Sequence, residues 1–167
     1  MSEITTYYLE MTSPDALTEK PHAGGLTVTE CEIPQFQVNR FMYRFVGESW
    51  QWTERLSWSD QQWQAYVNDD KLRTWVAYCQ GSLAGYYELQ SQAGGDVEIA
   101  YFGLVESFIG RGFGGYLLYH AIQSAWDWGD TRRVWVHTCS LDHPGALGNY
   151  RGRGMSLYRT ETEPSQT

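Results

Sequence analysis

Apolar residues along this chain fall into short runs and alternating stretches that are typical of β-strands. These runs predict strands over residues 6–11, 26–29, 74–79, 83–90, 97–105, 133–138 and 155–160. The three central strands are separated only by short segments that contain glycine, Gln80-Gly81-Ser82 and Ala93-Gly94-Gly95. Because such short turns join neighbouring antiparallel strands, these three strands predict an antiparallel meander.

Four other segments carry apolar residues at intervals of three and four, which is the spacing of an amphipathic helix. They predict helices from Pro34 to Gly47, from Ser59 to the Asp69-Asp70 turn, from Phe113 to Gly129 and from Pro144 to Gly154. The first residues of the second helix, Ser59-Asp60-Gln61-Gln62, match a capping box, in which two side chains satisfy free N–H groups. Strands and helices in this order predict a mixed α+β sheet with helices between its strands.

Length and charge limit the kinds of protein that this chain can be. A chain of 167 residues with 42% hydrophobic residues suits a single domain over residues 1–167, with residues 161–167 as a frayed tail. The 20 acidic and 12 basic residues give a formal net charge of −8, which repels a polyphosphate backbone. We therefore expect no nucleic-acid partner, and a cationic or amine substrate suits this field better.

The cysteines and the N-terminal residues indicate a compartment. Cys31, Cys79 and Cys139 are widely spaced and include no C-x-x-C pair, so neither a disulfide framework nor a zinc site is expected. No run reaches the roughly 18 apolar residues of a membrane span. The first residues lack the basic and apolar regions of a signal peptide. These features predict a cytoplasmic protein with no bound metal and no membrane partner.

The glycine-rich segment Ile109-Gly110-Arg111-Gly112-Phe113-Gly114-Gly115 lies between a predicted strand and the longest predicted helix. Glycine allows a tight turn that brings several N–H groups together, and the helix N-terminus adds a positive dipole. This arrangement predicts an anion-binding loop, and an ordinary surface turn is the alternative. A P-loop is excluded because Tyr116-Leu117 follows the last glycine, and the glycine spacing does not match the dinucleotide fingerprint.

A second motif, Ala146-x-x-Asn149-Tyr150-x-x-x-Gly154-Met155, follows a further predicted strand. Together with Ile109-x-x-Gly112-x-Gly114 and the strand that carries Glu98, it resembles the GCN5-related N-acetyltransferase (GNAT) superfamily, over about residues 75–158. The resemblance implies a central, mostly antiparallel sheet whose strands splay around an acetyl-CoA site, with flanking helices. It also implies that the protein transfers an acetyl group from acetyl-CoA directly to a primary amine.

The resemblance further implies which residues contact acetyl-CoA. They lie at the end of one strand, in the glycine-rich segment and on the last short helix: Leu104, Ile109, Gly110, Arg111, Gly112, Phe113, Gly114, Gly115 and Asn149. The N–H of Leu104 matches the family's donor to the thioester oxygen. Ile109 stands where the family usually has Gln or Arg, Asn149 replaces an apolar residue, and Met155 replaces Phe. Because isoleucine offers no donor to the pyrophosphate, we expect Arg111 and the backbone amides to make that contact.

Two residues are candidates for moving protons. Tyr150 matches the tyrosine that protonates the leaving thiolate in the family, and its alternative role is that of a packing residue. Glu98 matches the base of the histone-acetylating branch, and its alternative role is a carboxylate that pairs with an arginine or lies at a solvated strand start. Glu88 on the adjacent strand is the fallback base. His137 is either a relay through water or a structural histidine.

The variable early helices and their loop set the substrate in this superfamily. The candidate substrate-binding residues are Trp50, Trp52, Glu54, Arg55 and Glu88. Aromatic faces beside a carboxylate can hold a substituted ammonium, and the alternative is that the tryptophans only pack the loop. The sequence thus predicts an N-acetyltransferase acting on a small-molecule amine. A peptide or protein acetyltransferase and a non-catalytic CoA-binding sensor are the alternatives, and a homodimer stays open.

Overall fold

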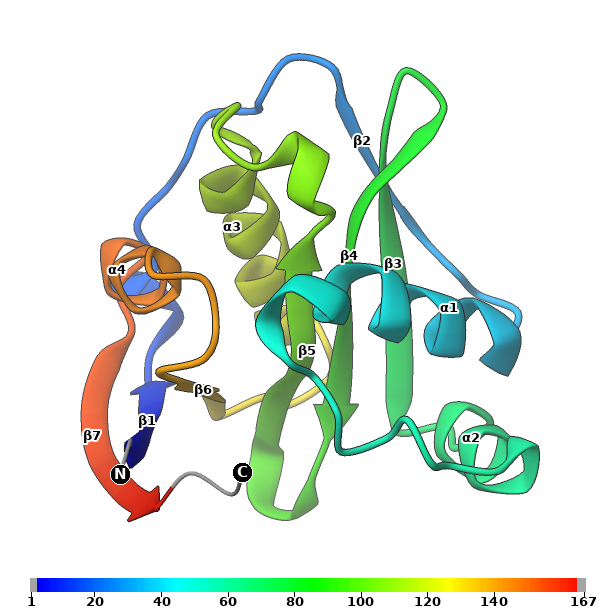
Figure 1. Ribbon diagram of the computed structural model, residues 1–167. Helices are drawn as coiled ribbons and strands as arrows, with labels where there is room; N and C mark the ends of the chain where they lie inside the picture. The colour runs from blue at the N-terminus through cyan, green and yellow to red at the C-terminus, as the bar shows by residue number, and fades with distance from the viewer. Residues whose placement is uncertain (1–2, 165–167) are drawn as a thin grey trace.

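The computed structural model describes residues 3–164, which contain one seven-stranded sheet (Figure 1). The strands are β1 (Glu3–Met11), β2 (Leu26–Glu30), β3 (Leu72–Cys79), β4 (Ser82–Ser91), β5 (Asp96–Leu104), β6 (Arg133–Cys139) and β7 (Ser156–Pro164). The helices are α1 (Phe36–Gly47), α2 (Asp60–Val67), α3 (Phe113–Trp126) and α4 (Ala146–Gly152). Short 3-10 turns are η1 (Pro14–Ala16), η2 (Glu48–Trp50), η3 (Ala93–Gly95) and η4 (Glu106–Phe108).

The predicted mixed α+β architecture is confirmed, including each predicted strand and helix. The strands lie in the order β2-β3-β4-β5-β6-β1-β7, and β3, β4 and β5 form the expected antiparallel meander. Helix α2 begins with the expected capping box, since the side chains of Ser59 and Gln62 each accept from the other's backbone N–H. Helix α1 begins at Phe36, two residues after the proline that was expected to open it.

Strands β5 and β6 form the only parallel pair in the described sheet, and they pair over a short stretch. Their register joins Asp96 to Arg133, Val97 to Val134 and Glu98 to Trp135, and no later residues of the two strands pair. Both strands nevertheless continue, β5 to Leu104 and β6 to Cys139. The sheet therefore splays open between the carboxyl halves of these two strands, as predicted.

Helices cover both faces of the sheet (Figure 1). Helix α3 packs against β4, β5 and β6 in the largest core cluster, which includes Leu117, Leu118 and Ala121. Helix α1 lies across the opposite face, where Met42 and Val46 pack in a separate cluster. Because each helix buries its apolar stripe on a different face, the core is divided into two layers by the sheet.

The C-terminal strand corrects one prediction. Residues 161–164 were expected to belong to a frayed tail, but they extend β7, which pairs with β1 from Glu3↔Pro164 to Glu10↔Ser156. Strand β1 in turn pairs with β6, so the first described residues bridge β6 and β7. Pairing with a strand from the other end of the chain orders this segment. Residues 165–167, the rest of the predicted tail, lie outside the described residues.

In residues 3–164, the helices are too short and too polar for one of them to cross a lipid bilayer.

Candidate active site

A pocket of about 280 Å³ lies where β5 and β6 separate. Its lining comes from the end of β5, the glycine-rich segment, the β6–α4 connection, α4 and the segment around η2. Ten predicted site residues line it: Trp50, Trp52, Leu104, Ile109, Gly110, Gly112, Gly114, Gly115, Asn149 and Tyr150. The remaining lining residues are Phe102, Gly103, Thr138, Asp142, His143, Gly145 and Ala146. Segments far apart in the sequence therefore meet at one site.

The glycine-rich segment presents backbone rather than side chains at one end of this pocket. Gly110 and Gly112 have φ values of +90° and +82°, in the left-handed region that favours glycine. Gly112 is the N-cap of α3, no side chain accepts from the N–H groups there, and the first turn of the helix contains no acidic residue. These N–H groups and the helix dipole are thus available to an anion.

The end of β5 offers two further backbone donors. The N–H of Val105 donates to the carbonyl of Ala84 on β4, at 2.8 Å. Because successive N–H groups of a strand point to opposite sides, those of Leu104 and Phe102 point away from β4, toward the side where β6 has diverged. Leu104 was a predicted donor, whereas Phe102 was not considered.

The side chains in and beside the glycine-rich segment have different surroundings. Asn149 of α4 donates from Nδ2 to the carbonyl of Gly114 at 3.1 Å, which joins α4 to the first turn of α3. Phe113 is buried in the core and packs against Phe108. The guanidinium of Arg111 lies over the Phe108 ring, 5.1 Å from its centre. Neither Phe113 nor Arg111 lines the pocket, and their contact with the coenzyme stays a prediction.

Tyr150 lies at the α4 side of the pocket and is 5% exposed. Burial, and to a smaller extent the negative charge of Asp142, raises the pKa of its phenol well above the usual value. A buried phenol that holds its proton this firmly is a neutral hydrogen-bond donor at physiological pH. The side chain can therefore donate a hydrogen bond to a nearby anion.

Asp142, which belongs to no sequence motif, joins three segments beside Tyr150. One oxygen of its carboxylate accepts from the indole N–H of Trp52 at 3.0 Å, and the other accepts from Thr138 Oγ1 and the N–H of Cys139. The Trp52 bond spans from the η2 segment to the β6–α4 connection. A carboxylate that accepts three such bonds is fixed in position.

Trp50 and Trp52 are two of the aromatic residues of the lining. Trp50 meets His143 edge to face, with ring centres 5.2 Å apart. Trp52 also packs against Tyr43 and Tyr101, at 5.8 and 5.1 Å. Both tryptophans thus line the pocket, and Trp52 also packs the loop core. Their contact with substrate stays a prediction.

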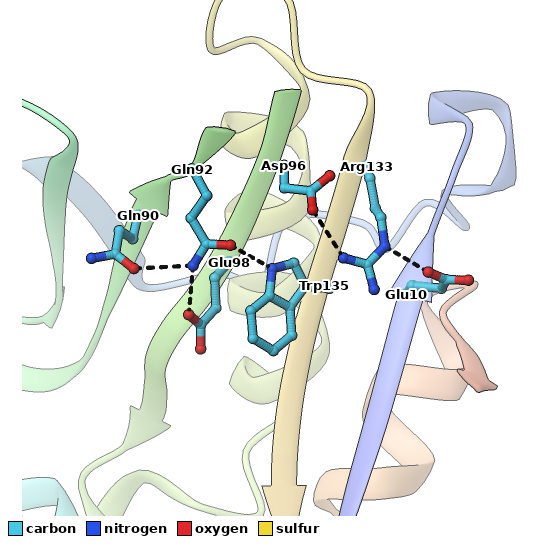
Figure 2. A network of polar contacts seen from close by, with 7 residues as sticks. All are labelled: Glu10, Gln90, Gln92, Asp96, Glu98, Arg133 and Trp135. Atoms are coloured by element: carbon cyan, nitrogen blue, oxygen red, sulfur yellow. Dashed lines mark hydrogen bonds and ion pairs between the residues drawn. The ribbon is translucent and has the colours of Figure 1, made fainter. Parts of the chain in front are cut away.

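Glu98 lies at the fork where β5 and β6 begin to separate, outside the pocket lining (Figure 2). Gln92 donates from Nε2 to its carboxylate at 2.9 Å, and His137 Nε2 lies 3.6 Å from the other oxygen. Burial raises the pKa of Glu98, while His137 and Gln92 act in the opposite direction. Glu98 is six residues before Leu104 on β5, which corresponds to about 20 Å along a strand.

Glu88 and Arg55 belong to a closed interior network. Glu88 is fully buried and accepts from Asn39 Nδ2 at 2.8 Å and from the Tyr66 hydroxyl at 2.6 Å. The Arg55 guanidinium lies over the Tyr66 ring at 4.1 Å, and also over Trp58, Trp63 and Tyr101. Arg55 Nη1 is buried without a hydrogen-bond partner in residues 3–164. Neither Glu88 nor Arg55 lines the pocket, and their contact with substrate stays a prediction.

Glu54, the remaining predicted substrate residue, is exposed on the α1–α2 connection. Its negative charge helps to raise the pKa of Tyr101 and of Cys139, after the larger effect of burial at each. Glu54 therefore lies near both strands that flank the splay. In residues 3–164, no group of three His, Cys, Asp or Glu residues is arranged to hold a metal ion.

Comparison with known proteins gives a family and a fold. Residues 37–155 match the family model described as the acetyltransferase (GNAT) family. Among curated proteins no sequence matches. Solved structures with a similar fold include a GCN5-related N-acetyltransferase from Sphaerobacter thermophilus, with a TM-score of 0.70 and 19% identity over 94% of this chain and 49% of that one.

Two other solved structures are similar in fold. One is a GCN5-related N-acetyltransferase from Kribbella flavida, with a TM-score of 0.65 and 17% identity over 95% of this chain and 56% of that one. The other is an aminoglycoside acetyltransferase from an uncultured soil metagenomic sample, with a TM-score of 0.61 and 15% identity over 77% of this chain and 87% of that one. This chain spans about half the length of the first two structures.

Proposed function

The chain belongs to the acetyltransferase (GNAT) family, and from this membership we propose that it transfers an acetyl group from acetyl-CoA to a primary amine of a small molecule. The observation that carries the proposal is the pocket at the splay. A glycine-rich anion-binding turn lies at one end of it, and a buried, neutral tyrosine lines it. Acetyl-CoA supplies the activated thioester, and the amine is the nucleophile.

The coenzyme would bind through backbone groups. The turn at Gly110 and Gly112, with the first N–H groups of α3, provides donors and a positive dipole for a pyrophosphate. The N–H group of Phe102 is directed to the splay and would pair with the amide-containing arm of the coenzyme. Holding both reactants in place can lower the barrier by several kcal/mol.

The N–H of Leu104 would polarise the thioester carbonyl. Attack by the amine turns this carbonyl into an oxyanion, and a donor that is already oriented stabilises the charge without reorganisation. Because the donor is backbone, the contact does not depend on the leucine side chain. This assignment rests on the direction of the N–H group and on the position of Leu104 in the pocket lining.

Tyr150 would protonate the leaving thiolate. A thiol has a pKa near 8.5, so the departing sulfur requires a proton at neutral pH. The burial that raises the pKa of Tyr150 keeps the phenol protonated in the resting protein. Asp142 reinforces this state, because a second negative charge next to the phenolate would be unfavourable. Because the same shift makes the phenol a weaker acid than a free thiol, the transfer would require a thiolate that is itself buried beside it.

Glu98 would accept the proton that the amine must lose. An alkylammonium has a pKa of about 10.4, so the amine needs a base before or during attack. Glu98 does not line the pocket, so the proton would pass through water or through His137, whose neighbour Thr138 does line it. The raised pKa of Glu98 makes it a better base than an exposed carboxylate.

The acceptor is proposed to be a small cationic amine. One solved structure of similar fold is titled an aminoglycoside acetyltransferase in complex with sisomicin. The formal net charge of −8 and the exposed carboxylate of Glu54 would attract such a cation. Trp50 and Trp52, which line the pocket, offer aromatic faces to it.

The first experiment is a melting-temperature series with acetyl-CoA and free CoA, and with ATP and NAD at equal concentration as controls. A ligand of the native state stabilises by mass action, so we expect a rise in melting temperature confined to the CoA compounds. Equal shifts with ATP, or no shift, would contradict the proposed coenzyme.

Release of CoA is then followed with small amines and with lysine peptides. Turnover with small amines alone supports the proposal. Turnover with peptides alone would instead indicate a peptide or protein acetyltransferase. Binding of acetyl-CoA without turnover of any amine would indicate a CoA-binding sensor.

A further inference from the structure

Lys20 lies against the first turn of α3, at the edge of the pocket. A β-carbon placed on Gly115 would meet the Cε of Lys20 at 3.2 Å and its Cδ and Cγ at 3.4 Å. Gly115 is itself part of the pocket lining. The lysine stem therefore runs along the backbone of the helix start, in space that a side chain at position 115 would occupy.

The segment that carries Lys20 is held in place on both sides. The N–H of Thr18 donates to the carbonyl of Arg153 at 2.9 Å, and Arg153 Nη1 donates back to the carbonyl of Glu19. After the lysine, the ring of His22 meets the ring of Tyr116 on α3 edge to face, with centres 4.7 Å apart. The connection between β1 and β2 is thus anchored to the end of α4 and to the first turns of α3.

The charge of Lys20 has no acidic partner within ion-pair distance in the described part of the chain. Its carbon stem lies against Gly115, the third residue of α3, so the ammonium group is near the N-terminus of that helix. The guanidinium of Arg111, the other nearby cation, lies over the Phe108 ring. Lys20 is consequently a cation placed to meet an anion at this helix start.

An anionic ligand needs such a local charge because the chain as a whole is acidic. The formal net charge is −8, and Asp142 contributes a carboxylate to the pocket itself. Position 109, which holds Ile, offers no donor. We infer that Lys20 binds the pyrophosphate of the coenzyme and supplies, from a different segment, the side-chain donor that Ile109 lacks. This inference rests on the proposed use of acetyl-CoA.

The test compares three variants by calorimetric measurement of the Kd for CoA. Lys20→Met keeps most of the stem and removes the charge, and Lys20→Arg keeps the charge. Lys71→Met is the matched control, because Lys71 is the only other lysine of the sequence and is also exposed. We expect Lys20→Met to weaken CoA binding by about five- to tenfold, and the other two variants to bind nearly as the parent protein.

Two probes and one change of salt locate the contact. The loss in Lys20→Met should persist with 3′-dephospho-CoA, which retains the pyrophosphate, and should vanish with S-acetylpantetheine, which has no phosphate. It should also shrink as salt rises, because screening weakens the contact in the parent protein. A loss that vanishes with 3′-dephospho-CoA, or that persists with S-acetylpantetheine, overturns the inference.

The role of Lys20 and the proposed use of acetyl-CoA are contradicted by different results. If the parent protein binds CoA and Lys20→Met binds it equally well, Lys20 has no role and the proposed function stands. If the parent protein binds no CoA compound, the proposed function fails and the inference about Lys20 fails with it. A melting curve of each variant without ligand establishes that the variant is folded.

Discussion

Two polar regions of this molecule differ in how their groups are satisfied. In the pocket at the splay, the groups that face the cavity include backbone N–H groups of the glycine-rich segment and of β5, which lack strand partners there. Beneath α1 and α2, the carboxylate of Glu88 already accepts from Asn39 and Tyr66, and aromatic rings enclose Arg55. The first region has donors to offer to a ligand. In the second region the Glu88 carboxylate has its partners within the chain, whereas Arg55 Nη1 is buried without a hydrogen-bond partner in residues 3–164.

The difference teaches how to tell a binding site from a structural network among similar residues. Glu88 and Glu98 lie on neighbouring strands, and burial raises the pKa of both. Glu88 is fully buried, whereas Glu98 stays partly open beside His137, whose side chain is 46% exposed. Access to solvent and to the splay therefore distinguishes the open carboxylate of Glu98 from the buried carboxylate of Glu88, whereas the direction of the pKa shift does not.

The largest effect is expected on catalysis, from Tyr150→Phe, which removes the proposed proton donor from the pocket. We expect kcat to fall about a thousandfold, equivalent to about 4 kcal/mol, because the leaving thiolate loses its proton donor. The Kd for acetyl-CoA should change little, since the ring remains. Tyr86→Phe is the control, because Tyr86 is also buried and its hydroxyl has no partner in residues 3–164. An unchanged kcat in Tyr150→Phe would remove this tyrosine as the acid.

The next largest effect is expected on stability, from Glu88→Ala, which removes the carboxylate at the centre of the buried network. Removing the carboxylate leaves the Asn39 amide and the Tyr66 hydroxyl without their buried acceptor. We expect the free energy of unfolding to fall by about 3 kcal/mol in a urea titration. Glu88→Gln should lose less, because it preserves the volume and one acceptor. Loss of activity at unchanged stability would instead place Glu88 in the site.

Glu88 also makes the free energy of unfolding depend on pH. Burial raises its pKa, although the bonds from Tyr66 and Asn39 oppose the rise, so the folded state holds the proton more tightly than the unfolded state. Its contribution to stability is therefore full below the ordinary pKa of 4.5 and declines as pH rises through the raised value. We expect Glu88→Gln to remove that decline from a plot of unfolding free energy against pH.

A smaller effect is expected from Glu98→Gln, which tests the open carboxylate. In the parent protein, kcat/KM should rise with pH through a pKa above 4.5, because the base acts only when ionised. Glu98→Gln should lower the plateau about a hundredfold and remove this rise. His137→Asn should move the rise to higher pH, because His137 lowers the pKa of Glu98. A profile that is unaltered in Glu98→Gln would exclude Glu98 as the base.

The smallest effect is expected from Gly112→Ala, which strains the anion-binding turn. No atom lies within 4 Å of the added carbon, so the cost comes from the φ of +82° and should be about 1 kcal/mol of stability. The Kd for CoA should rise as the turn adjusts. Gly148→Ala is the control, because this position in α4 is equally open and its φ is not positive. Equal changes in both variants would mean that the turn geometry is unimportant.

The glycine-rich segment and the α4 motif were readable in the sequence because their function depends on local backbone geometry. A glycine at position 112 can adopt a left-handed φ just before a helix, and the strand and helix that flank it follow from local patterns. Local reasoning also located the strands, the helices and the capping box at Ser59. Leu104, Asn149 and Tyr150, all of which line the pocket, came from the family resemblance instead.

The contacts made by the α1–α2 connection and by the β1–β2 connection could not be predicted from local sequence patterns. Arg55 was expected to face substrate, but its guanidinium lies over the rings of Trp58 in the same connection, Tyr66 of α2 and Tyr101 of β5. Asp142 and Lys20 carried no sequence signal, since neither belongs to a motif. Their positions depend on contacts with Trp52 and Gly115, which are 90 and 95 residues away in the chain.

The sequence by itself determined the elements, the sheet class and the anion-binding turn, because these depend on the periodicity and conformational freedom of neighbouring residues. Only the tertiary structure decided which carboxylate is open, which arginine is enclosed and which lysine reaches the turn. Those outcomes depend on burial and on partners from distant segments, and burial is a property of the packed sheet and helices rather than of any one stretch.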